Sequence, residues 1–219
     1  MQSAAPPADL GPFTELLFAD QPDAADLFGS AGPGAAAAQT FQLLQQRSRG
    51  QRRIRLRTLE LGAVARPELL TLVEIINDDM PFLVDSIMGE IQALNVGVRL
   101  VAHPIIRVER AEGGAYERMV GIGSRHEAGG HHNAIQESVI VILLDALNPD
   151  QRRDLMTAIS TTLDDVRVAV SDWQPMLIRM QQAAAQLEQS LTKVGADVVR
   201  ETLAFCRWLM DGHFTLLGE

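Results

Sequence analysis

Residues 71–108, TLVEIINDDMPFLVDSIMGEIQALNVGVRLVAHPIIRV, contain the pattern that decides the fold. They open with an apolar run rich in β-branched residues, 72–76, which is short enough for a strand. Apolar residues then recur at helical spacing over 83–94. The residues at 95–97, Asn-Val-Gly, suit a helix end, because Asn and Gly accept the left-handed conformation of a C-cap. With a second strand over 98–108, the stretch predicts a strand–helix–strand unit.

The joint between the first strand and the helix is polar and acidic. Asn77, Asp78 and Asp79 precede a helix N-terminus, whose free N–H groups and dipole can hold a small carboxylate or phosphate. Pro81 suits the first helical turn, where a missing N–H is tolerated. The same residues can also serve only as helix caps, and the pattern alone favours that simpler role.

A continuous apolar run, Val139–Leu144, is typical of a central strand that is buried on both faces. Before this run the pattern predicts a hairpin turn at Glu109–Gly114 and a returning strand over Tyr116–Ile122. After it the pattern predicts a helix that starts at Asn148-Pro149, with Gln151 at capping-box spacing, and a last short strand, Arg167–Val170. The order over residues 71–171 is therefore β-α-β-hairpin-β-α-β. It predicts an α+β fold with a ferredoxin-like βαββαβ antiparallel sheet.

In that fold the first and third main strands are central, and the second and fourth lie at the edges. Pro104 falls in the second main strand and supports this arrangement, because proline in a sheet belongs on an edge or at a bulge. The two crossover helices cover only one sheet face, and leaving the other wet would forgo roughly 1.5–3 kcal/mol per large side chain. We therefore expect a further layer: the N-terminal helices, the C-terminal helices or a second copy.

The flanking regions are expected to add helices to this sheet. Before it, Ala35–Arg47 predicts a helix and 54–58 a half-exposed strand, while the four arginines of Arg47–Arg53 most simply form a solvated turn. After it, two seams at 3-4 spacing predict a helical hairpin: Leu177, Met180, Ala184, Leu187 and Leu191, then Val198, Thr202, Phe205 and Leu209. The predicted domains are 1–66, 67–171 and 172–219.

Composition bounds the class of protein. The net charge of -9 argues against a nucleic-acid partner, because phosphate binding needs concentrated positive charge. The single cysteine, Cys206, excludes an internal disulfide and fits a reducing cytosol. No apolar run approaches the roughly 20 residues that span a bilayer, and no signal peptide is evident, so we expect a cytoplasmic protein without a membrane partner. The chain stops inside an apolar run, His213–Leu217, which indicates a piece of a longer protein.

Other candidate chemistry is weak. His126, His131 and His132, with Glu127 beside them, could bind a metal, but their spacing fits no established site and an exposed loop is favoured. Cys206 lies in a helical seam and is best explained as a buried thiol. No glycine-rich dinucleotide motif, P-loop or nucleophile motif occurs, so we expect no catalytic residue, no metal and no cofactor in this chain.

The blocks VEIINDDMPFLVDSIMGEIQALNVGVRLVAHPIIRVER, ESVIVILLDAL, DDVRVAVSDWQPM and ETLAFCRWLMDGHFTLLGE occur in this order between residues 71 and 219. As a set they resemble the N-terminal segment of the large, NAD-specific glutamate dehydrogenases of bacteria. The resemblance implies a much longer parent that oxidatively deaminates glutamate to 2-oxoglutarate with NAD. Its nucleotide and substrate residues would lie beyond Glu219.

The same resemblance implies that the segment is similar to ACT domains, ferredoxin-like modules that often bind amino acids and regulate metabolic enzymes. It places an effector-binding loop at Asn77, Asp78, Asp79, Met80, Pro81, Phe82 and Leu83. The usual ACT loop has a glycine after the proline, which lets a ligand approach the backbone, whereas this chain has a phenylalanine that would fill the space.

Two functions follow. One is a regulatory or assembly module of the parent that contacts other domains of the same polypeptide in a homo-oligomer and senses an amino-acid effector. The alternative is a purely structural docking module without a ligand, in which Phe82 and the two-sided strand Val139–Leu144 pack against other domains or a second chain. A free-standing enzyme is a third and weaker reading.

Overall fold

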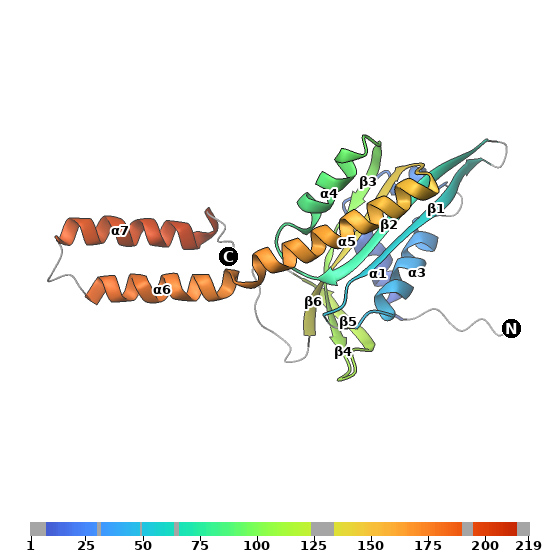
Figure 1. Cartoon of the computed structure of the whole chain (residues 1–219). Coiled ribbons are helices and arrows are strands. Elements are labelled where there is room, and N and C mark those ends of the chain that lie inside the picture. The colour runs from blue at the N-terminus through green and yellow to red at the C-terminus, as the bar shows by residue number, and fades with distance from the viewer. Residues whose placement is uncertain are drawn as a thin grey trace. The chain divides into compact units, whose positions relative to one another are not determined.

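The structure is a computed structural model, and it describes residues 8–29, 32–48, 50–63, 66–123, 134–189 and 195–213. Along the described part of the chain, three N-terminal helices precede two strands, a helix, four further strands and three C-terminal helices (Figure 1). The helices are α1 (Leu10–Leu17), α2 (Ala24–Phe28), α3 (Gly32–Gln45), α4 (Leu83–Ala93), α5 (Pro149–Ser171), α6 (Trp173–Gln189) and α7 (Ala196–Trp208). The strands are β1 (Arg53–Ala63), β2 (Arg66–Asp78), β3 (Val98–Ala102), β4 (Ile105–Arg110), β5 (Tyr116–Ile122) and β6 (Ala134–Asp145).

The six strands form one antiparallel sheet in the order β1-β2-β6-β4-β5, with β3 also paired to β6. β3 and β4 are one predicted strand, interrupted at His103-Pro104, and both pair with the same side of β6. The Val139 amide donates to the Pro104 carbonyl across the interruption, at 3.0 Å. The predicted central positions of the first and third main strands, the returning strand over 116–122 and the α+β ferredoxin-like class are confirmed. The predicted edge position of the second main strand is wrong for β4, which lies between β6 and β5, because the returning strand β5 pairs with it.

One predicted strand is wrong. Residues Arg167–Val170 lie within α5, which continues to Ser171, and Val168 is largely exposed. The short β-branched run suggested a strand, but no glycine or proline interrupts the helical pattern that precedes it. The position beside β2 is taken instead by β1, which pairs antiparallel with β2 from Arg53 opposite Ile76 to Ala63 opposite Arg66.

Both faces of the sheet are covered, as the run Val139–Leu144 requires, and every residue of that run is 0% exposed. One face packs with α1, α2 and α3 in a single apolar cluster, in which Phe13, Phe41 and Leu44 join Val139 and Val141. The helix α4 and the part of α5 up to residue 160 lie over the opposite face (Figure 1). Of the three candidates for the further layer, the N-terminal helices are therefore the one that covers the second face.

The helix ends follow the predicted capping chemistry. Asn95, which follows α4, adopts a positive φ of 51°. At the start of α5, the Asn148 amide donates to the Gln151 side chain at 3.0 Å, and the Gln151 amide donates to the Asn148 side chain at 2.9 Å. This reciprocal pair confirms the predicted capping box.

The chain divides into two compact units, one of residues 1–80 and 84–160 and the other of residues 81–83 and 161–219. The three-domain division given above stays a prediction. Within the second unit α6 and α7 form the predicted helical hairpin. Among the residues that the structure describes, no helix is both long enough and apolar enough to span a membrane.

The predicted seam of α7 is wrong by one residue. Val199 and Leu203 are the buried side chains of α7, whereas Val198 and Phe205 are 58% and 59% exposed. Both registers carry apolar residues at 3-4 spacing, so the sequence alone could not separate them.

Candidate functional site

The predicted effector loop does not start where β2 was expected to end. Asn77 and Asp78 still belong to β2, opposite Ser138 and Glu137 of β6, and the Asp79 amide donates to the carbonyl of Gln136 at 3.1 Å. The sheet pairing therefore fixes the backbone of the first three predicted residues. The side chains of Asp78 and Asp79 bind partners within the protein.

The remaining predicted residues lead into α4. Met80, Pro81 and Phe82 are half-buried, and Leu83, the first residue of α4, is buried. Phe82 has a φ of 67°, in the left-handed region that side chains with a Cβ adopt at a cost. The resemblance implied a glycine at this position; its conformation is kept, but a phenyl ring occupies it.

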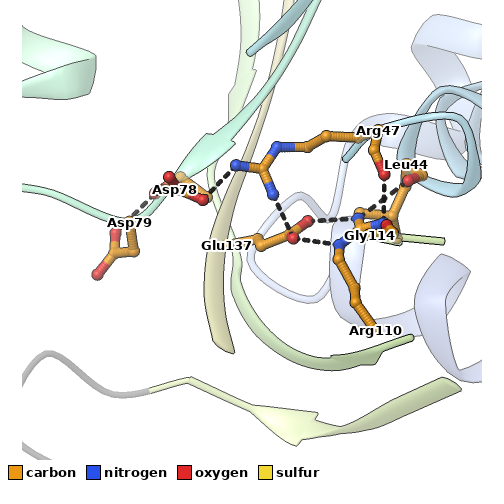
Figure 2. Close-up of polar contacts among 8 residues, drawn as sticks. Leu44, Arg47, Asp78, Asp79, Arg110, Gly114 and Glu137 are labelled. Atoms are coloured by element: carbon orange, nitrogen blue, oxygen red, sulfur yellow. Dashed lines mark hydrogen bonds and ion pairs between the residues drawn. The ribbon is translucent and has the colours of Figure 1, made fainter. Parts of the chain in front are cut away.

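Asp78 belongs to a buried ion-pair network at the end of β2 (Figure 2). Arg47, two residues after α3, donates from one guanidinium nitrogen to Asp78 and from another to Glu137 of β6. The side chains of Arg47 and Glu137 are 0% exposed, and that of Asp78 is 36% exposed. The expectation of a solvated turn over Arg47–Arg53 is therefore wrong at Arg47.

Arg110, the last residue of β4, completes the network and uses all five of its N–H donors. It makes a bidentate pair with Glu137, Nε to Oε1 at 2.6 Å and Nη2 to Oε2 at 2.9 Å. Its other donors bind the carbonyls of Leu44, Arg47 and Gly114. Arg110 thus ties the C-terminal end of α3, whose carbonyls carry partial negative charge, to the β4–β5 hairpin and to β6.

The network balances its charges. Arg47 and Arg110 supply two positive charges, and Glu137 and Asp78 supply two negative ones. Burying a charge without a partner is far more costly than burying a balanced and hydrogen-bonded set. Asp78 is therefore needed inside the protein, because without it one buried arginine would lack a countercharge.

Asp79 binds Ser138, the residue of β6 after Glu137, whose side chain points to the opposite face of the sheet. The Ser138 hydroxyl donates to Asp79 Oδ1 at 2.6 Å, and His103 Nε2 lies 3.1 Å from the same hydroxyl oxygen. Because that hydroxyl hydrogen is used toward Asp79, His103 Nε2–H is the donor to Ser138. A hydrogen-bond chain therefore runs from the break between β3 and β4 through Ser138, which is buried, to the predicted loop.

His103 also lines a cavity of about 520 Å³ between the end of α1 and the β3–β4 break. Its walls combine apolar side chains with three polar ones, Asp20, Gln21 and His103. The Gln21 side-chain amide is held by the carbonyl of Val101 at 2.8 Å. Sequence reasoning did not find this cavity, because it joins residues about 80 positions apart.

A second buried carboxylate lies on the same face of the sheet as the N-terminal helices. Glu74 of β2 accepts hydrogen bonds from Thr40 of α3 at 2.7 Å and from Arg55 and Arg57 of β1. Burial would raise the pKa of Glu74, but the hydrogen bonds from Arg55, Arg57 and Thr40 outweigh burial and hold the pKa below its usual value of 4.5. Glu74 therefore stays ionised and fastens α3 and β1 to β2.

The other candidates of the sequence are less informative. The histidine-rich loop with His126, His131 and His132 lies outside the described residues. Within the described residues, no group of three His, Cys, Asp or Glu side chains is placed to hold a metal ion. Cys206 is half-buried in α7. The arginine and glutamate network was the main omission, and its only sequence signal was Glu137, a glutamate two residues before the apolar run Val139–Leu144.

Known proteins match the chain along most of its length. A family model described as glutamate dehydrogenase, ACT1 domain, matches residues 20–159. The NAD-specific glutamate dehydrogenase of Pseudomonas aeruginosa is 28% identical over 179 residues, which are 81% of this chain and 11% of that protein. Its counterpart of the same name in Halomonas elongata is 30% identical over 150 residues, which are 68% of this chain and 9% of that protein.

These matches confirm the resemblance found in the sequence. The chain spans about a tenth of the length of the curated relatives that it matches. No solved structure shows significant similarity to it.

Proposed function

We propose, from the premise that the chain belongs to the glutamate dehydrogenase ACT1 domain family, that it is the N-terminal regulatory and assembly module of an NAD-dependent glutamate dehydrogenase. The longer protein would oxidise glutamate to 2-oxoglutarate with NAD, in a homo-oligomer located in the cytoplasm. The sequence of this chain holds no dinucleotide-binding glycine motif, so the NAD and glutamate sites would lie in other domains of the polypeptide.

The observation that favours an assembly role is that the carboxylates of Asp78 and Asp79 are already bound by side chains of the protein. An amino-acid effector needs acceptors for its ammonium group, and Asp78 and Asp79 are the carboxylates of the predicted loop. Arg47 already donates to Asp78, and Ser138 already donates to Asp79. Phe82 adds a ring where the family resemblance implied open backbone. The loop is therefore better suited to rigid packing than to ligand capture.

Deletion in the full-length protein tests this assembly role. A variant of the longer polypeptide that lacks residues 1–219 should lose its oligomeric state or its regulation, measured by sedimentation and by NAD reduction with glutamate. A variant that assembles and responds to effectors like the parent would overturn the proposal. Discovery that the chain is made in the cell as a separate 219-residue protein would overturn the link to the dehydrogenase itself.

Effector sensing is the second candidate, and one observation favours it. The cavity of about 520 Å³ has the size of a small-molecule site, and His103 connects it through Ser138 to Asp79 in the loop. An occupant that contacts His103 could thus alter the loop. Calorimetric titration of the full-length enzyme with each common amino acid tests this, with His103→Ala as the variant that should weaken binding. If none of the amino acids gives a binding signal, effector sensing is excluded and only the assembly role remains.

A further inference from the structure

Helix α7 carries two apolar stripes, and the hairpin uses only one of them. Val199 and Leu203 are buried in the hairpin. The second stripe consists of Val198, Thr202 and Phe205 at i, i+4 and i+7, and Trp208 extends it. All four are exposed, Val198 by 58%, Phe205 by 59% and Trp208 by 48%. We call these four residues the outer stripe.

The aromatic side chains of the outer stripe are ordered against each other. The rings of Phe205 and Trp208 stack with centroids 6.1 Å apart and planes inclined by 14°. A hollow of about 320 Å³ adjoins them, lined by Arg207, Trp208, Met210 and Asp211. Stacked aromatics beside a flexible methionine form the kind of surface that anchors a partner helix.

The spacing identifies the shape of what fits. Apolar residues at i, i+4 and i+7 form a seam along one side of a helix, and such a seam packs against another amphipathic helix. The middle helix of a bundle typically has two apolar stripes, one facing each of its two neighbouring helices. Among the described residues the outer stripe stays exposed, so they do not fill the position of a third helix on it.

The size of the outer stripe indicates where that helix comes from. A phenylalanine or tryptophan presents about 150–250 Å² when fully exposed, so the half-exposed pair with one valine offers roughly 300 Å². Stable association between separate proteins buries about 800 Å² per partner. A surface this small holds its occupant only when the occupant is tethered, because a tether gives an effective concentration in the millimolar range.

We propose that an amphipathic helix from a later part of the same polypeptide packs on the outer stripe and completes a three-helix bundle. This inference rests on the proposed function, since it needs a polypeptide longer than 219 residues. The curated relatives are about ten times as long as their matched regions, so they contain ample chain for such a helix.

Thiol labelling of the full-length protein tests the proposal. In a variant whose native Cys206 is replaced by serine, we would introduce Val198→Cys on the outer stripe and, separately, Ala204→Cys as the control. Ala204 is also exposed on the same helix. At about 3.6 residues per turn it lies about 120° around the helix axis from Val198, although it is one turn before Trp208. In the folded protein the maleimide reaction at position 198 should be at least tenfold slower than at position 204, and in urea the two rates should be equal.

Three results would overturn it. Equal rates at both positions in the folded protein would mean that nothing covers the outer stripe. Protection that survives cleavage after residue 219 and removal of the later chain would mean that residues 1–219 cover it themselves. Protection that disappears on dilution would mean that a second copy covers it. The absence of any longer polypeptide would be a separate result, which overturns the proposed function.

Discussion

Replacing Glu137 with glutamine should destabilise the sheet unit strongly, although the two side chains have nearly the same shape. The carboxylate accepts hydrogen bonds from Arg47 and from two nitrogens of Arg110. Both arginines are almost fully buried, and after the change they would share only the charge of Asp78. The amide nitrogen of glutamine would also face a guanidinium donor.

The expected magnitude follows from this imbalance. Breaking a buried ion pair by removing one partner costs about 3–5 kcal/mol, a large part of a typical domain stability of about 5–15 kcal/mol. Glu109→Gln is the matched control, because Glu109 makes the same bidentate pair with Arg118 at 2.7 and 2.8 Å, but Arg118 is 60% exposed. Surface pairs contribute about 0–1 kcal/mol.

The assay has to report on the sheet. Both tryptophans, Trp173 and Trp208, lie in the hairpin helices, so tryptophan fluorescence would follow the wrong unit. Hydrogen exchange of the β6 amides in urea measures the free energy of opening the sheet. If Glu137→Gln lowers this free energy no more than Glu109→Gln does, the buried network does not stabilise the fold as argued.

Three further predictions concern separate parts of the fold. The pKa of Glu74 is lower in the folded protein than its unfolded value of 4.5, so the ionised Glu74 stabilises the fold above that pH and this stabilisation is lost as the pH falls below it. In urea unfolding from about pH 6 to about pH 3, the free energy of unfolding of Glu74→Gln should therefore fall less with pH than that of the parent. Phe41→Ala should lower the free energy of unfolding by about 3–5 kcal/mol in the same assay, because Phe41 is 1% exposed between α3 and the sheet. If the N-terminal helices folded as a separate domain, this substitution would leave the hydrogen exchange of the β6 amides unchanged. Gln151→Ala should remove half of the capping box at the start of α5 and cost about 1 kcal/mol, with no effect expected if the helix start is held by packing alone.

Local patterns predicted most of the fold, because the relevant forces act between neighbours in the sequence. The capping box at Asn148 and the helix end at Asn95 depend only on adjacent residues. The strand Val139–Leu144 was recognisable because burial on both faces removes the alternation of polar and apolar residues. Arg167–Val170 failed because a four-residue β-branched run is compatible with a strand and with the end of a long helix, and only tertiary contacts decide.

The polar network could not be predicted, since its partners are distant in sequence. Arg47 looked like a solvated arginine among four, and its burial depends on Glu137, 90 positions away. The same local sequence is compatible with a solvated basic turn and with a turn whose first arginine is buried in an ion-pair network. The signal that could have shown the difference was Glu137, a glutamate close to a strand run that is otherwise fully apolar.

The buried network also changes what the predicted loop can do. A ligand with an ammonium group that reached Asp78 would compete with Arg47 for the same carboxylate. Arg47 would then share Glu137 with Arg110, and the buried cluster would carry an excess of positive charge. Such binding could proceed only if the Arg47 guanidinium left Asp78, and because Arg110 binds Glu137 and also the carbonyls of Leu44 and Arg47, the rearrangement would reach the end of α3 through Arg110. A sensing loop at this position would therefore have to be coupled to the seating of the N-terminal helices, whereas an assembly module gains from keeping the same contacts fixed.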